Sequence, residues 1–188
     1  MRRLYLVLAL WLAGCASSPP AIQLVTRPAN SVLSTYAMSG RMSVKHDSDR
    51  TFVEVHWSHS ASMEDEILLL APLGQTIARI YRNAENVELD TSDKQYFAEG
   101  AEELTQNLLG WRLPLEGMLY WVLALPEPGS KADIERDENN RVSLLKQDGW
   151  EIQYTKYAVR TVDSLPLRMK LRREGLEIEL LIDAWELK

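Results

Sequence analysis

Short segments in which apolar and polar residues alternate constrain the fold of this 188-residue chain more than any other feature. Segment 36–45 places tyrosine, methionine and valine on one side, and serine, arginine and lysine on the other. A period of two with one apolar face is typical of a half-buried strand. Brief polar connections join such segments, which predicts an antiparallel meander. The strand candidates are 36–45, 53–57, 66–71, 75–82, 86–91, 95–98, 132–136, 141–146, 150–157, 166–173 and 176–187.

Two stretches after the sixth strand candidate have helical spacing instead. Apolar residues recur at this spacing from Ala101 to Leu108, with acidic residues in the first turn, and Gly110 ends the pattern. A second helix is expected from Pro114, a favoured first position, to Leu125. It is apolar around most of its circumference, so protein or ligand must cover it. We therefore predict a mainly β fold with two inserted helices over the apolar face of one curved sheet.

The N-terminus has the features of a secretory signal. Arg2 and Arg3 precede an apolar run, 4–12, that is too short to span a bilayer and ends in Leu-Ala-Gly-Cys at Cys15. These four residues resemble the lipobox of bacterial lipoproteins. In such proteins the cysteine receives a diacylglycerol thioether, the signal is removed, and the new amino terminus is acylated. The resemblance implies that residues 1–14 are a signal peptide and that Cys15 is lipidated.

Residues 15–34 follow as a polar, proline-bearing tether, with a short helical stretch expected near residues 30–34. An aspartate just after the lipidated cysteine usually retains a lipoprotein in the inner membrane. Ala16 and Ser17 stand there in this chain, which implies export to the outer membrane. The net charge of −6 argues against nucleic acid and against electrostatic binding to anionic lipid. Contact with outer-membrane lipid is thus expected through acylated Cys15, since acyl chains suffice for anchoring.

Few residues suggest catalysis. His56 and His59 lie three apart near a strand end, so they should face opposite ways and not share a metal; we interpret them as surface imidazoles. The acidic run 64–66 is interpreted as a solvated turn, and lipidation would consume the only cysteine. The glycines form no phosphate-binding loop. We therefore predict no catalytic residues, no metal site and no cofactor, although an enzyme whose site escapes this reading stays an alternative.

Methionine is frequent on the predicted apolar faces. Met38, Met42, Met118 and Met169 all occupy such positions, and tryptophans lie in or beside the same elements. Methionine is flexible and adapts to irregular partners. An ordinary core explains this pattern, and so does an interior that binds apolar ligands.

Three motifs bear on that choice. Residues 110–115, Gly-Trp-Arg-Leu-Pro-Leu, lead into Trp121; residues 71–74 read Ala-Pro-Leu-Gly; and residues 183–188 read Asp-Ala-Trp-Glu-Leu-Lys. Together with the lipobox, their order and spacing resemble the outer-membrane lipoprotein receptor family LolB. The resemblance runs along nearly the whole chain, although the segment before Tyr36 is shorter here.

The resemblance implies an unclosed antiparallel half-barrel of about eleven strands, residues 35–188, with helices over its concave face. It implies a monomeric, periplasm-facing receptor that takes triacylated lipoproteins from the soluble carrier LolA and inserts them into the outer membrane. The sequence contains no nucleotide-binding motif, which is compatible with transfer driven by affinity. A lipidated structural or assembly factor with no ligand cavity is the alternative.

The resemblance also directs attention to particular residues. Leu73, at the tip of the Pro-Leu-Gly turn, is expected to protrude and to assist insertion into the membrane, rather than to fold back onto a strand. The residues expected to line an acyl-chain cavity lie on the apolar faces of the strands and of the second helix. They are Met38, Met42, Val55, Trp57, Leu69, Met118, Trp121 and Met169.

Overall fold

The computed structural model describes residues 30, 33–83, 85–98 and 101–187. The predicted signal 1–14, the lipidation site Cys15 and all of the tether except residues 30, 33 and 34 lie outside these residues. Residues 31 and 32 of the short helical stretch expected near 30–34 lie outside them as well. Asn30 is buried, and its side-chain amide donates a hydrogen bond to the carbonyl oxygen of Leu123 at 2.7 Å.

The described residues form one eleven-stranded antiparallel sheet, so the predicted number of strands and their antiparallel arrangement are confirmed. The strands before the helices are β1 (Tyr36–His46), β2 (Asp49–His59), β3 (Asp65–Leu70), β4 (Thr76–Arg82), β5 (Val87–Asp90) and β6 (Gln95–Ala98). The strands after them are β7 (Ala132–Arg136), β8 (Val142–Gln147), β9 (Trp150–Tyr157), β10 (Pro166–Arg173) and β11 (Leu176–Leu187).

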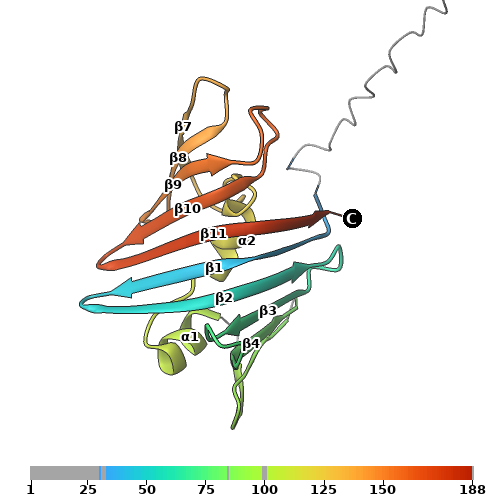
Figure 1. Ribbon diagram of the computed structural model, residues 1–188, viewed down its shortest axis with the longest axis vertical. Coiled ribbons are helices and arrows are strands. Elements are labelled where there is room, and N and C mark those ends of the chain that lie inside the picture. Colours follow the sequence, from blue (N-terminus) through green and yellow to red (C-terminus); the bar gives the residue numbers. More distant parts are fainter. Residues whose placement is uncertain (1–29, 31–32, 84, 99–100, 188) are drawn as a thin grey trace, which may run out of the picture.

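The first and last strands pair in the middle of the sheet, where β1 lies between β2 and β11. The edges are therefore β6 and β7, and the sheet does not close. These two edge strands are the ones that the helical segment joins, so the chain must cross the sheet between them. Figure 1 shows α1 (Ala101–Leu109) and α2 (Leu115–Trp121) together on one side of the sheet, which is how the segment crosses.

The two faces of the sheet differ as the alternation predicts. Side chains on the helix-covered face form the hydrophobic core, which also contains apolar residues of both helices. The outer face carries cross-strand ion pairs, including Arg41–Asp183 at 2.8 Å and Arg168–Glu179 at 2.7 Å. Such exposed pairs contribute only about 0–1 kcal/mol each, so burial of the apolar face holds the sheet together.

The helices end for local reasons. Gly110 follows α1 with a φ of 79°, as expected for a glycine at the end of a helix. The expectation that the second helix continues to Leu125 is wrong, because α2 ends at Trp121. Ala124 adopts a φ of 57°, and the amides of Ala124 and Leu125 bond back to the carbonyls of Trp121 and Tyr120. These two hydrogen bonds form a Schellman motif, which ends the helix and reverses the chain before Pro126 is reached.

Candidate functional site

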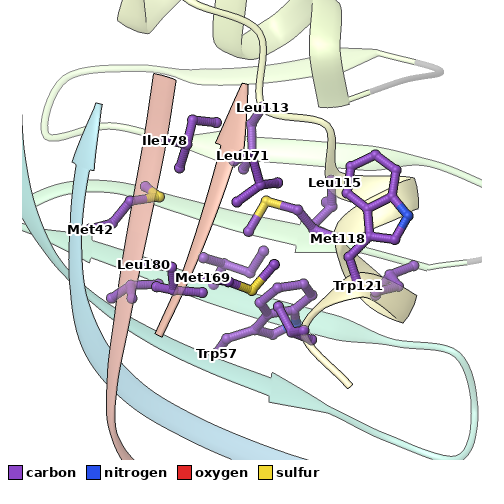
Figure 2. Close-up of a cluster of buried hydrophobic side chains, with 14 of the residues drawn as sticks. Met42, Trp57, Leu113, Leu115, Met118, Trp121, Met169, Leu171, Ile178 and Leu180 are labelled. Atoms are coloured by element: carbon purple, nitrogen blue, oxygen red, sulfur yellow. The ribbon is translucent and has the colours of Figure 1, made fainter. Parts of the chain in front are cut away.

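The residues predicted to line an acyl-chain cavity gather in one place. All eight belong to the same core cluster, and each is only 0–4% exposed. They come from β1, β2, β3, α2 and β10, which lie far apart in the sequence. In Figure 2, Met118 of α2 faces Met169 of β10 and Leu180 of β11 across the interior. The side chains form a packed cluster rather than the wall of an open cavity, so an acyl chain could enter only if the helices moved away from the sheet.

Three hydrogen bonds fasten α2 to the sheet. The hydroxyl of Tyr154 donates to the carbonyl of Trp121 at 2.8 Å, and that of Tyr36 donates to the carbonyl of Leu119 at 3.3 Å. The indole nitrogen of Trp121 donates to the side-chain oxygen of Gln147 at 2.9 Å. Burial raises the pKa of Tyr154 well above its ordinary value, so its hydroxyl stays protonated and keeps donating. Side-chain hydrogen bonds therefore attach α2 to the sheet, whereas the strands are joined to one another by backbone hydrogen bonds.

Gly117 explains how the large indole of Trp121 fits against its own helix. A Cβ atom at position 117 would lie 2.4 Å from the indole ring of Trp121. Real atoms do not approach this closely, so any larger residue would displace the ring. The sequence pattern alone gave no sign of this constraint, because a glycine in a helix normally only weakens it.

Leu73 lies in the turn that joins β3 to β4. The amide of Gly74 bonds to the carbonyl of Ala71 at 2.7 Å, and Gly74 has a φ of 82°, which favours glycine. The turn projects the leucine into solvent, where it is 94% exposed. The side chain therefore does not fold back onto a strand, and its role at a membrane stays a prediction.

A buried polar cluster lies at the other end of β3, and it corrects two expectations. Asp65 is only 1% exposed rather than part of a solvated turn, and His59 is mostly buried rather than a surface imidazole. Asp65 accepts hydrogen bonds from the indole of Trp57, from the Nδ1 of His59 and from the guanidinium of Arg82, each at 2.9 Å. Burial alone would raise the pKa of Asp65. The hydrogen bonds from His59, Trp57 and Arg82 and the charge of Arg82 outweigh it, so that the pKa is lowered.

The alternation of β3 contains the signal for this cluster. Asp65 precedes Ile67 and Leu69 at a period of two, so it belongs to the buried face, and it pairs in register with Arg82 of β4. A carboxylate at such a position requires a buried cation nearby. The strand was expected to begin at residue 66, one residue too late to place Asp65 inside.

The described residues contain neither a candidate metal centre nor a membrane-spanning helix. Among them, no group of three or more histidine, cysteine, aspartate or glutamate side chains is placed to hold a metal ion. In the same part of the chain, neither helix has the length and apolar composition to cross a membrane. Two helices cover the apolar face of the sheet, and Leu73 is exposed in the turn between β3 and β4 at one end of the strands.

Comparison with known proteins identifies the family. The family model described as "Outer membrane lipoprotein LolB" matches residues 34–185. The chain belongs to the LolB family. An outer-membrane lipoprotein LolB of Nitrosomonas europaea is 34% identical over 93% of this chain and 87% of its own length. The LolB of Thiobacillus denitrificans is 33% identical over 99% of this chain and 98% of its own.

Solved structures support the fold. A LolA superfamily protein of Nitrosomonas europaea superposes with a TM-score of 0.56 at 8% identity, over 85% of this chain and 90% of that one. At this identity the likeness shows the fold alone, and the fold is the one that the LolB resemblance implied. This chain therefore shares its overall fold with that solved structure.

Proposed function

We propose that this LolB-family chain is a receptor, anchored in the outer membrane and facing the periplasm. It accepts triacylated lipoproteins from the soluble carrier LolA and inserts them into the outer membrane. The observation that carries the proposal is the packed cluster of apolar side chains, 0–4% exposed, that lies beneath two helices joining the open edges of the sheet. The two helices cover this surface without closing the sheet, so they can separate from it while the strand ladder stays intact.

The anchor is part of the proposal. Residues 1–14 act as a signal peptide, Cys15 carries the acyl chains, and residues 15–34 tether the folded domain, residues 35–188, to the membrane. Membrane-bound acyl chains hold such a domain without any spanning segment. The lipid serves as a tether rather than as part of the transfer, because the apolar surface lies downstream in the folded domain.

The physical need for a receptor follows from the hydrophobic effect. Burial of one methylene contributes about 0.8 kcal/mol, so exposing a chain of about 16 carbons to water costs on the order of 10 kcal/mol. A triacylated lipoprotein must therefore pass from one apolar cavity to another before it reaches the bilayer. Transfer without a nucleotide requires the receptor to prefer the chains over the carrier, and each 1.4 kcal/mol of preference gives a factor of ten.

A transfer assay tests the proposal. LolA loaded with a triacylated lipoprotein is mixed with the untethered domain, and the cargo is followed by affinity capture of each partner. We expect the cargo to move to the domain, and then into added liposomes. Cargo that stays on LolA at every ratio of the two proteins would refute the receptor role.

The packed state of the cluster favours a second candidate, a lipidated structural factor with no ligand cavity. A fluorescent fatty-acyl probe separates the two candidates. The receptor should take up the probe as its helices open, whereas a core that only holds the fold together should take up none.

A further inference from the structure

The turns between strands place several features at one end of the sheet. Because the strands are antiparallel, the turns at residues 47–48, 71–75, 148–149 and 174–175 all lie at the same end, here called the Leu73 end. The tether joins the domain at the opposite end, where β1 begins. In Figure 1 the tips of β1, β2, β10 and β11 and the helix α1 lie together at the Leu73 end, on the left of the view.

A hollow of about 330 Å³ opens at this end, between α1 with the segment that follows it and the strand tips. Gln106, Trp111 and Arg112 belong to its helical side, and His46, Trp150 and Arg173 to its strand side. Small-molecule sites occupy about 300–1,000 Å³, so the hollow suits a compact polar group and not three acyl chains.

The hollow borders the apolar cluster directly. Trp111 and Trp150 line it and are also buried members of the core. The ring of Trp150 lies 6.1 Å from that of Trp121, one of the predicted acyl-chain residues. A ligand in the cluster would therefore reach the hollow by passing these tryptophans.

The arginines of the hollow differ from those of the outer face. Arg41 and Arg168 each form an ion pair with a carboxylate. Among the described residues, Arg112 has no hydrogen-bonding or charged partner, and the guanidinium of Arg173 has only the ring of Trp150, at 5.9 Å from its centroid. Each guanidinium presents five N–H donors in a planar fork. At the rim of the hollow these donors are available to a ligand.

We propose that this hollow binds the polar linkage of a triacylated cysteine, meaning the two glyceryl esters and the N-terminal amide from which the three chains extend. Arg112 and Arg173 donate hydrogen bonds to the carbonyl oxygens of this linkage, while the chains enter the apolar cluster beyond Trp111 and Trp150. The linkage is neutral, which fits a hollow that also contains Glu102 and Glu174, since their carboxylates would repel a phosphate. The inference rests on the proposed receptor function and specifies where the head of the cargo is held.

The position has a consequence for release. The bound linkage would lie at the same end of the sheet as Leu73, so the acyl chains would leave the protein next to the membrane surface that Leu73 contacts. Chains held with their linkage at the tether end would have to cross the length of the domain instead.

The test compares two probes on the full domain: a tripalmitoylated cysteinyl peptide, and a fluorescent alkane that has no carbonyl group. The Arg112→Gln/Arg173→Gln double variant should bind the lipopeptide about tenfold more weakly, which corresponds to 1.4 kcal/mol, and bind the alkane as the wild type does. Both arginines are exposed, so the variant should unfold at the same urea concentration. Arg112→Gln alone should give a smaller loss, and Arg168→Gln, which removes an arginine from the outer face, should change neither affinity.

Equal affinity of the double variant and the wild type for the lipopeptide would overturn the hollow as the linkage site and leave the receptor function intact. Equal loss for both probes would overturn it as well, because the arginines would then affect only the apolar cluster. A wild type that binds neither probe would overturn the receptor function, and this inference with it.

Discussion

Leu73 offers the sharpest test of the membrane step, because its contribution in water can be separated from its contribution in lipid. The side chain is 94% exposed, so replacing it removes almost no buried contact, and the free energy of unfolding should change by less than about 0.5 kcal/mol. Burying one leucine in lipid contributes about 2 kcal/mol, a factor of about 30 in partition. This is too little to anchor a protein and enough to orient one that is already tethered.

Leu69 is the matched control within the same hairpin. It is 1% exposed, so Leu69→Ala should lower the free energy of unfolding by about 2–5 kcal/mol in a urea titration. Leu73→Glu should unfold as the wild type does, accept lipoprotein from LolA at the wild-type rate, and insert it poorly into liposomes. The transfer assay reports acceptance and insertion separately, since cargo on the receptor and cargo in sedimented liposomes are measured in the same sample.

Two outcomes would refute this reasoning. Normal insertion by Leu73→Glu would show that the exposed leucine has no role at the membrane. Loss of acceptance together with insertion would place Leu73 at the interface with the carrier or in the path of the acyl chains instead.

Three further predictions concern the anchor, the interior and the buried charge. Mass spectrometry of the membrane-extracted protein should show a triacylated N-terminal Cys15, and an unmodified thiol with the signal retained would contradict the anchor. Met118→Asp should weaken binding of the acyl probe more than it lowers the free energy of unfolding, because α2 can move to expose the charge to water. Met169→Asp is the control in a central strand and should unfold the domain. Unfolding of both variants to the same extent would assign Met118 to an ordinary core. Asp65→Asn should lower the free energy of unfolding at pH 7 by about 3–5 kcal/mol, because it leaves the charge of Arg82 buried and unpaired. The folded pKa of Asp65 is lowered, so this stabilisation is present above its ordinary pKa of about 3.9 and is lost as pH falls through the folded pKa. Urea titrations at several pH values measure the difference in free energy of unfolding between wild type and variant. A difference that stays constant as the pH falls below about 4 would contradict the prediction.

Period-two alternation predicted the sheet because it reports directly which side chains are buried. All eleven strands were predicted in order, and the helices were placed correctly after the sixth. In β10, for example, Met169 and Leu171 are both buried. One face of the strand is buried, so the burial of one residue predicts the burial of the residue two positions away. The open edges could not be read from the alternation, because pairing between β1 and β11 joins opposite ends of the chain. The resemblance to LolB supplied the open sheet, whereas the pairing of β1 with β11 was not predicted.

The errors arose where a long-range partner determines the environment of a residue. Asp65 and His59 have polar side chains, so a pattern of hydrophobicity assigns them to the surface. Asp65 is buried because Arg82 and Trp57 supply hydrogen bonds from the neighbouring strands. His59 is mostly buried because its Nδ1 bonds to the same carboxylate. The end of α2 was missed for a local reason instead, since an alanine is rarely the residue that adopts a positive φ at the end of a helix.

The energetics of α2 bear on how a packed structure would receive acyl chains, as the proposed function requires. Three side-chain hydrogen bonds hold the helix, at about 1 kcal/mol each, and its buried apolar side chains such as Leu115 and Met118 contribute about 2 kcal/mol each. Moving the helix into water would cost roughly as much as burying a single 16-carbon chain returns, on the order of 10 kcal/mol. Without cargo the helix therefore stays on the sheet, and the cluster remains dry. Three chains make more apolar contact with the cluster than the helix gives up. Under the proposed function, the cargo therefore drives the opening to the extent that its contacts with the receptor exceed those that it leaves in the carrier.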